Sequence, residues 1–281
     1  MAKTKTAYVC TDCGSEYSRW LGQCTDCKAW NTISEFRQAK LPARGGNFTG
    51  FAGATLNNEV KIQTLDTIDL TDLPRFSSGF VEFDRVLGGG IVPGSAILIG
   101  GEPGAGKSTL LLQTMCSLAA NMPALYITGE ESLQQVAMRA KRLNLPTDKL
   151  KMLSETSVEN ICHIAEKEKP KIMVIDSIQV MHMSDIQSAP GSVSQVREAA
   201  AFLTRFAKQH HVAMILVGHV TKDGSLAGPK VLEHCIDCSI MLEGSTDSRY
   251  RTLRGTKNRF GAVNELGVFA MTGTGLKEVK N

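Results

Sequence analysis

The residues Gly101–Ser108 carry the strongest chemical signal in the chain. They read Gly-Glu-Pro-Gly-Ala-Gly-Lys-Ser, which has the G-x-x-x-x-G-K-S spacing of a phosphate-binding P-loop. Glycines in such a loop let backbone N–H groups close around phosphate oxygens, and the helix that follows adds the positive end of its dipole. We therefore expect a nucleoside triphosphate here, with Lys107 at its outer phosphates and the Ser108 hydroxyl on Mg²⁺. The predicted nucleotide-binding residues are Gly101, Glu102, Pro103, Gly104, Ala105, Gly106, Lys107, Ser108, Thr109 and Asp176.

The residues that flank this loop suit the same function. The apolar run Ser95–Gly100 precedes it and predicts a strand, and Thr109–Cys116 can continue after it as a helix. Strand, glycine-rich turn and helix form the context that the motif requires. A glycine-rich turn with an incidental lysine is the alternative, and the context disfavours it.

Four cysteines near the N-terminus have the spacing of a metal site. Two C-x-x-C pairs, Cys10/Cys13 and Cys24/Cys27, are separated by ten residues. Each pair can direct two thiolates at one centre, and two pairs give the closed S₄ site of structural zinc. Because so short a module has little core of its own, Zn²⁺ must supply its folding energy. A redox dithiol pair is the alternative.

A third C-x-x-C, Cys235 and Cys238, has no second pair nearby. It precedes the apolar run Ile240–Leu242, which predicts a strand, and positions i and i+3 of a strand point to opposite faces. We interpret these two cysteines as structural rather than as a metal or redox site.

Asp176 follows the apolar run Ile172–Ile175, which predicts a strand. Strands of an open parallel sheet deliver functional groups at their C-terminal ends. The position of Asp176 is typical of a Walker B carboxylate, which would hold Mg²⁺ opposite Ser108. A helix cap is the alternative interpretation.

Two further predicted strands end in groups that could serve hydrolysis. Glu130 follows Leu125–Ile127 and is predicted to orient and deprotonate the attacking water, with adjacent Glu131 as the alternative base. Both glutamates could instead cap the next helix, where negative charge is favoured. His219 ends the segment that begins at Val212, and we expect it to sense the γ-phosphate; a structural histidine is the alternative.

Basic residues gather in two places after His219. The polar loop 221–230 contains Lys222 and Lys230 and is a candidate nucleic-acid contact, although it could be an ordinary surface loop. Further along, Lys257 and Arg259 lie in a strongly cationic segment. They could reach the nucleotide of a neighbouring subunit, as an arginine finger does, or belong to a basic solvated edge strand.

These groups require a scaffold in which strands and helices alternate. The spacing predicts an α/β fold with a mostly parallel sheet, helices on both faces and an antiparallel extension near the C-terminus. A zinc ribbon precedes it, so that we expect a C4 ribbon over 1–34, a linker over 35–60 and an ATPase domain over 61–281. Besides those given above, the expected helices cover 80–87, 133–143 and 193–209, and the expected strands cover 124–127, 171–176, 212–217, 240–242, 250–253 and 266–270.

The bulk properties of the chain fit this division. The 281 residues are 42% hydrophobic, which is enough for a large core, and the net charge of +3 neither demands nor excludes nucleic acid. No apolar run has transmembrane length, and no apolar signal segment follows the charged start. We expect a cytoplasmic protein with no membrane partner, in which the eight cysteines are reduced.

Several segments together resemble the bacterial RadA (Sms) family. They are the ribbon with Trp-Leu-Gly between its halves, the lead-in Phe76–Gly79 and Asp84–Gly90, the P-loop, Tyr126–Ser132 and Lys257–Gly261. Their order matches as well as their residues, and the resemblance covers essentially the whole chain.

The resemblance implies a RecA-like ATPase that works as a homo-hexameric ring on single-stranded and branched DNA. It implies DNA repair and recombination beside a RecA-type recombinase, with helicase or branch-migration activity. Lys257 and Arg259 match the family's basic Lys-Asn-Arg-Phe-Gly motif, which would couple ATP state to a neighbour and to DNA. Family members continue into a domain resembling the Lon protease, so that the resemblance implies a truncated chain.

Two other classes of function remain open from the sequence. A KaiC-type regulatory ATPase would use ATP state to switch protein partners without moving DNA. A zinc-ribbon adaptor would bind protein partners and use nucleotide only for assembly.

Overall fold

The computed structural model describes residues 6–10, 15–37, 64, 66, 74–219, 232–244 and 248–279. These residues form a three-stranded sheet near the N-terminus and a nine-stranded sheet in the rest of the chain. The smaller sheet contains β1 (Thr6–Cys10), β2 (Glu16–Tyr17) and β3 (Ile33–Arg37), paired antiparallel in the order β2-β1-β3.

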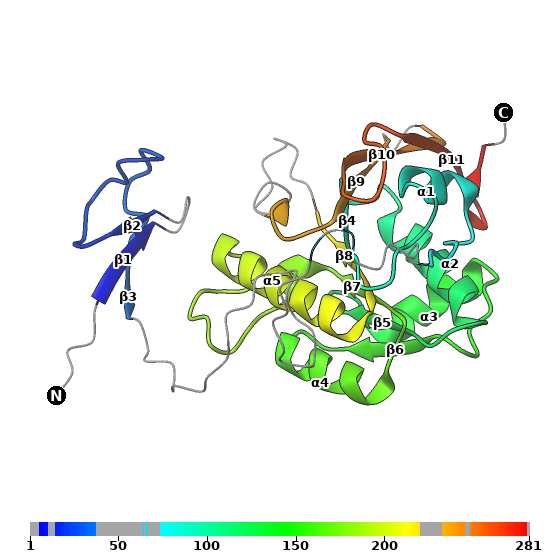
Figure 1. Cartoon of the computed structure of the whole chain (residues 1–281), viewed down its shortest axis with the longest axis horizontal. Helices are drawn as coiled ribbons and strands as arrows, with labels where there is room; N and C mark the ends of the chain where they lie inside the picture. The colour runs from blue at the N-terminus through cyan, green and yellow to red at the C-terminus, as the bar shows by residue number, and fades with distance from the viewer. Residues whose placement is uncertain are drawn as a thin grey trace.

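The large sheet has the order β12-β11-β10-β9-β4-β8-β7-β5-β6 (Figure 1). The six strands from β9 to β6 run parallel, and β10, β11 and β12 add an antiparallel extension beyond β9. The strands are β4 (Ala96–Gly100), β5 (Ala124–Thr128), β6 (Lys151–Ser154), β7 (Ile172–Asp176), β8 (Ala213–Val217), β9 (Cys238–Glu243), β10 (Tyr250–Asn258), β11 (Leu266–Thr272) and β12 (Gly275–Glu278).

Helices cover both faces of this sheet, as predicted. They are α1 (Val81–Val86), α2 (Lys107–Ala119), α3 (Leu133–Arg142), α4 (Val158–Glu168) and α5 (Val193–His210), with a 3₁₀ helix η2 (Ile178–Val180) after β7. Strand residues alternate between the two faces. On β4, Ile97 and Ile99 lie in a core with α1 and α2, whereas Leu98 lies in the core formed with α4 and α5.

Three of the helices, α3, α4 and α5, begin at serine residues that cap them. Ser132 accepts from the Gln135 N–H and Gln135 bonds back to the Ser132 N–H, a capping box at the start of α3. The side chains of Ser157 and Ser192 accept the same type of bond at α4 and α5. These caps fix where each helix leaves the loop that follows the preceding strand.

The predicted strands and helices are all present, with ends shifted by a few residues. Tyr250–Leu253 continues to Asn258, so that Lys257 lies within β10 rather than after it. For Thr252–Arg254 the interpretation as an edge strand is wrong, because this part is paired with β9 on one side and β11 on the other; Lys257 and Asn258 pair with β9 alone.

In the part of the chain that forms the nine-stranded sheet, the sequence analysis missed α4, β6, β12 and the 3₁₀ helix η2. The signal for α4 was present, since Val158, Ile161, Cys162 and Ala165 have helical spacing and are buried. β6 is short and partly exposed on both faces at the sheet edge, and so has no apolar pattern. Within the described residues, no helix has the length and apolar character needed to cross a bilayer.

Candidate nucleotide site

The P-loop connects β4 to α2 at the C-terminal edge of the parallel sheet. Gly106 caps α2 with a positive φ of 107°. A Cβ at this position would lie 2.8 Å from the end of the flexible Met271 side chain, which can move, so it is the positive φ that favours glycine. Ser108 and Thr109 follow in the first turn of α2, half-buried, and Glu102 and Pro103 are exposed at the tip of the loop.

The Lys107 side chain is buried beneath the loop. Its ammonium donates to the carbonyls of Gly101 at 2.6 Å and Glu102 at 2.9 Å. An ammonium has three N–H donors, so these contacts leave one for a ligand. Burial lowers the pKa of Lys107, and the negative charges of Asp176 and Glu130 oppose that shift.

Asp176 is the last residue of β7, and its carboxylate is held by a tyrosine. The Tyr126 hydroxyl on neighbouring β5 donates to Asp176 Oδ2 at 2.5 Å. Burial and the nearby carboxylate raise the pKa of Tyr126 well above its ordinary value, so that the hydroxyl stays a donor. Asp176 caps no helix, since η2 begins after Ser177. The sequence analysis missed Tyr126 as a site residue, although a hydroxyl within a buried strand requires a partner.

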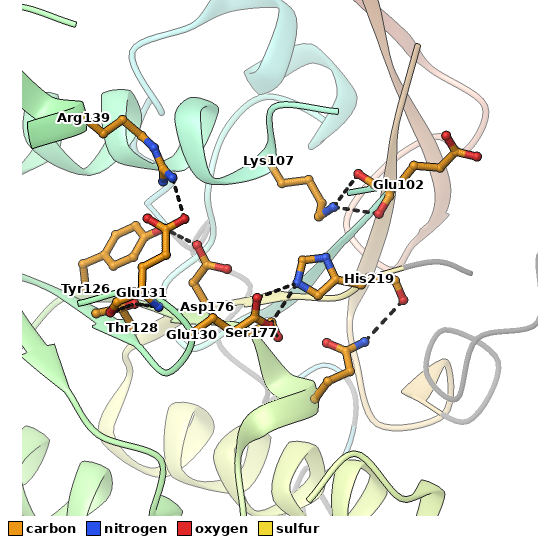
Figure 2. A network of polar contacts seen from close by, with 12 residues as sticks. Glu102, Lys107, Tyr126, Thr128, Glu130, Glu131, Arg139, Asp176, Ser177 and His219 are labelled. Carbon is orange, nitrogen blue, oxygen red and sulfur yellow. Dashed lines mark hydrogen bonds and ion pairs between the residues drawn. The ribbon is translucent and has the colours of Figure 1, made fainter. Parts of the chain in front are cut away.

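Glu130 faces His219 (Figure 2), and Lys107 is near enough for its charge to act on the Glu130 carboxylate. His219 Nε2 is 3.1 Å from Glu130 Oε1 and 3.3 Å from Oε2, and the Ser177 hydroxyl donates to Oε1. The bond to His219 is the main cause that lowers the pKa of Glu130. Glu130 is therefore a carboxylate fixed from two sides. Sequence reasoning did not find Ser177.

Glu131 points away from this group, toward α3 (Figure 2). Its carboxylate pairs with Arg139 at 2.5 Å, and its backbone is held by the Thr128 hydroxyl. The interpretation of Glu130 and Glu131 as helix caps is wrong, because Ser132 caps α3. The two adjacent glutamates thus have different surroundings.

His219 lies two residues after β8 ends, facing Glu130. Gln179 of η2 donates from Nε2 to the His219 carbonyl at 3.4 Å. Gln179 connects the end of β7 to the end of β8, a contact that sequence spacing gave no means to predict. Lys222 and Lys230 of the following loop lie outside the described residues.

Lys257 and Arg259 lie at the opposite edge of the sheet from the P-loop. Asn258, between them, is paired with Cys238 at the start of β9, while Gly100 at the P-loop edge is beside Met241. The P-loop follows the C-terminal end of β4, so these two cations lie toward the opposite end of the strands from this chain's own P-loop.

Both cations contact the segment that precedes β9. The Lys257 ammonium donates to the carbonyls of Ile236, at 2.9 Å, and Glu233. Arg259 donates to the carboxylate of Asp237 at 3.3 Å and the carbonyl of His234 at 3.4 Å. Burial is the main cause that lowers the pKa of Lys257.

Asp237 is a buried carboxylate that joins three elements. Besides Arg259, it accepts from Lys208 of α5 at 2.9 Å and 3.0 Å and from the Ala96 N–H at 2.9 Å. A buried carboxylate is stable only when paired and hydrogen-bonded in this way. Asp237 was not found from the sequence.

Three of the four predicted zinc ligands are described, and their sulfurs lie together. The Sγ atoms of Cys10, Cys24 and Cys27 are all within 4.8 Å of one another, and those of Cys10 and Cys27 are 3.6 Å apart. Thiolates bound to one Zn²⁺ at about 2.3 Å in a tetrahedron are about 3.8 Å apart, so these residues fit zinc. Cys13 lies outside the described residues.

Cys235 and Cys238 do not form a second site. Both are buried, and they lie in the cores on opposite faces of the sheet. Burial raises the pKa of both thiols, that of Cys238 to about 12. The structural interpretation of this pair agrees with their placement.

Comparison with known proteins defines the class. Residues 71–225 match the AAA domain family, and residues 8–35 match a family described as a rubredoxin metal binding domain. The first match covers more than half of the chain, which therefore belongs to the AAA domain family and contains an ATPase domain of this type behind a zinc ribbon.

Among curated relatives, the chain is similar to proteins named DNA repair protein RadA. It is 72% identical to that of Haemophilus influenzae, 70% to that of Escherichia coli and 46% to that of Bacillus subtilis, in each case over its whole length. This confirms the resemblance predicted from the sequence. The chain spans 61% of the length of these relatives.

Proposed function

We propose that this protein is a DNA-dependent ATPase of recombinational DNA repair, which uses ATP hydrolysis to move single-stranded DNA and process branched intermediates. The carboxylate of Glu130, fixed by His219 and Ser177 and close to the P-loop lysine, is the observation that carries the ATPase. The similarity to proteins named for DNA repair supports the substrate.

In this proposal the P-loop residues bind ATP, which supplies the phosphoanhydride bond. Lys107 neutralises charge on the outer phosphates, and the Ser108 hydroxyl and Asp176 hold Mg²⁺. Glu130 accepts a proton from the attacking water. His219 contacts Glu130 and itself lies at the start of the segment that follows β8, which suits a residue that passes the state of the γ-phosphate to the following loop.

Lys257 and Arg259 complete the site of a neighbouring copy in a homo-hexamer. Their place at the edge opposite the P-loop supports this, because a head-to-tail arrangement brings one subunit's opposite edge to the next subunit's nucleotide. Each P-loop would then be half of an active site, with the transition-state charge stabilised in trans.

The remaining partners follow from the same proposal. Cys10, Cys13, Cys24 and Cys27 hold structural Zn²⁺, and Lys222, Lys230, Lys257 and Arg259 contact DNA beside a RecA-type recombinase. The domains are the ribbon over 1–34, the linker over 35–60 and the ATPase domain over 61–281. A protein acting on chromosomal DNA in this way works in the cytoplasm.

The test is the rate of ATP hydrolysis with and without single-stranded DNA, at two protein concentrations and two salt concentrations. We expect DNA to raise the rate, higher protein concentration to raise the specific activity, and salt to reduce the DNA effect steeply. The matched control is Lys107→Ala, which should abolish hydrolysis. An ATPase that ignores DNA but captures protein partners according to nucleotide would instead support the KaiC-type switch.

A further inference from the structure

Arg251 is a buried cation immediately behind the P-loop. It is the second residue of β10, is 5% exposed, and donates from Nε to the carbonyl of Ala105 at 3.0 Å. Its Nη1 donates to the carbonyls of Tyr250, at 2.9 Å, and Ser248. The side chain passes closely over Gly244, where a Cβ would lie 2.6 Å from the Arg251 Cδ. The sequence around Arg251 matches none of the P-loop or strand-end motifs.

The partners of this guanidinium are all neutral. Across the described residues, no carboxylate lies within ion-pair distance of Arg251. Arginine remains charged at any physiological pH, and burying an unpaired charge is costly. The charge is therefore placed behind a loop that is built to receive an anion.

The contact with Ala105 also constrains the peptide that follows it. In a trans peptide the C=O of one residue and the N–H of the next point in opposite directions. Because Arg251 holds the Ala105 carbonyl toward β10, the Gly106 N–H is directed away from β10. That N–H belongs to the P-loop, whose backbone donors bind phosphate.

The neighbouring strands of the extension hold the loop and its helix in the same way. Gln113 of α2 exchanges two hydrogen bonds with the backbone of Leu276 on β12, at 2.9 Å and 3.1 Å. Met271 of β11 fills the space beside Gly106. The strands β10, β11 and β12 thus pack against the P-loop and α2.

We propose that Arg251 is a positioning residue for nucleotide binding: it orients the Ala105–Gly106 peptide toward the phosphates and contributes positive charge from behind the loop. This inference rests on the nucleotide site proposed above. It adds Arg251 to that site, near the start of β10, while Lys257 lies near the end of the same strand.

The test compares three variants of the full chain. Arg251→Met removes the charge and the hydrogen bonds at similar volume, and Arg251→Lys keeps the charge without the planar fork. Arg254→Met is the matched control, because Arg254 lies on the same strand but is half-exposed and pairs with Glu243 at 3.4 Å. Affinities for Mg-ATP and Mg-ADP are measured at a temperature at which circular dichroism shows each variant to be folded, together with KM and kcat.

Loss of a hydrogen bond to a charged group predicts about a tenfold or greater loss of affinity for Arg251→Met, with KM raised more than kcat is lowered. Arg251→Lys should recover part of the affinity, and Arg254→Met should equal the wild type. A lower melting temperature with unchanged affinity would show a merely structural role and overturn the proposal. If Arg251→Met does not fold, the Arg251→Lys variant decides. An affinity of that variant for Mg-ATP and Mg-ADP equal to that of the wild type overturns the proposal. A wild type that binds neither nucleotide refutes the nucleotide site itself, and this inference with it.

Discussion

The guanidinium of Arg259 lies 3.3 Å from the buried carboxylate of Asp237, at the sheet edge opposite Lys107. Asp237 also binds Lys208 of α5, so that one carboxylate fixes the end of β10 against a helix on one face of the sheet. Contacts within its own chain therefore fix the position of Arg259. In the proposed function, Arg259 acts at the nucleotide site of a neighbouring copy.

Action in trans predicts a specific result in mixed assemblies. Arg259→Ala and Lys107→Ala should each lose most ATP hydrolysis alone. Mixed together, they should recover part of it, because a Lys107→Ala subunit still offers Arg259 to the intact P-loop of its neighbour. Hydrolysis is measured over a series of mixing ratios. Recovery that never exceeds the sum of the separate activities contradicts action in trans.

Asp237→Asn should destabilise the ATPase domain. It leaves Lys208 and Arg259 without a counter-charge; because both cations reach solvent, we expect a cost of about 1–3 kcal/mol, that of losing hydrogen bonds to a charged group. The change is measured as the free energy of unfolding in denaturant.

Two further variants separate this pairing from a general loss of charge. Lys208→Met combined with Asp237→Asn should cost less than the sum of the two single changes. Arg254→Met, which removes a pair whose side chains are more than 40% exposed, should cost less than about 1 kcal/mol. Additive costs for Lys208 and Asp237 would argue against their coupling.

Glu130→Gln and Glu131→Gln should separate the two candidate bases. Glu130→Gln should lower kcat by at least about a hundredfold while nucleotide still binds, because a general base contributes that much. Glu131→Gln only weakens the pair with Arg139 and should leave kcat within about threefold. The reverse order of effects in steady-state kinetics would assign the base to Glu131.

Nucleotide affinity should fall at alkaline pH because of Lys107. Burial lowers the pKa of this lysine in the free protein, so above that pKa a proton must be taken up before the charged form can bind phosphate. The affinity for Mg-ADP should therefore begin to decline below pH about 10.4, the ordinary pKa of lysine. Lys107→Arg should show no such decline, since arginine stays charged. An affinity that is constant for the wild type up to pH 10.4 contradicts the prediction.

Removal of the metal should make the ribbon cysteines reactive toward alkylating reagents, while the buried cysteines elsewhere in the chain stay unreactive. Burial raises the pKa of Cys116 to about 11 and that of Cys162 and Cys238 to about 12, so these thiols carry almost no thiolate at neutral pH. Alkylation followed by peptide mass spectrometry should label Cys10 and Cys24 quickly only in the presence of a strong chelator. Equal labelling with and without chelator would argue against a bound metal.

The sequence by itself determined the features that depend on local spacing. The P-loop is eight consecutive residues, the ribbon ligands are two short pairs, and Asp176, Glu130 and His219 each end or closely follow an apolar strand. These signals survive without tertiary structure, because turns and strand ends are fixed by residues near in the chain.

The tertiary structure decided which residues meet across the sheet. Strand order places Tyr126 beside Asp176 and brings Arg251 to Ala105. The same order carries Arg259 to the opposite edge. These contacts join residues as many as 146 positions apart. They depend on hydrogen-bond register between strands, which no local pattern in a single sequence records.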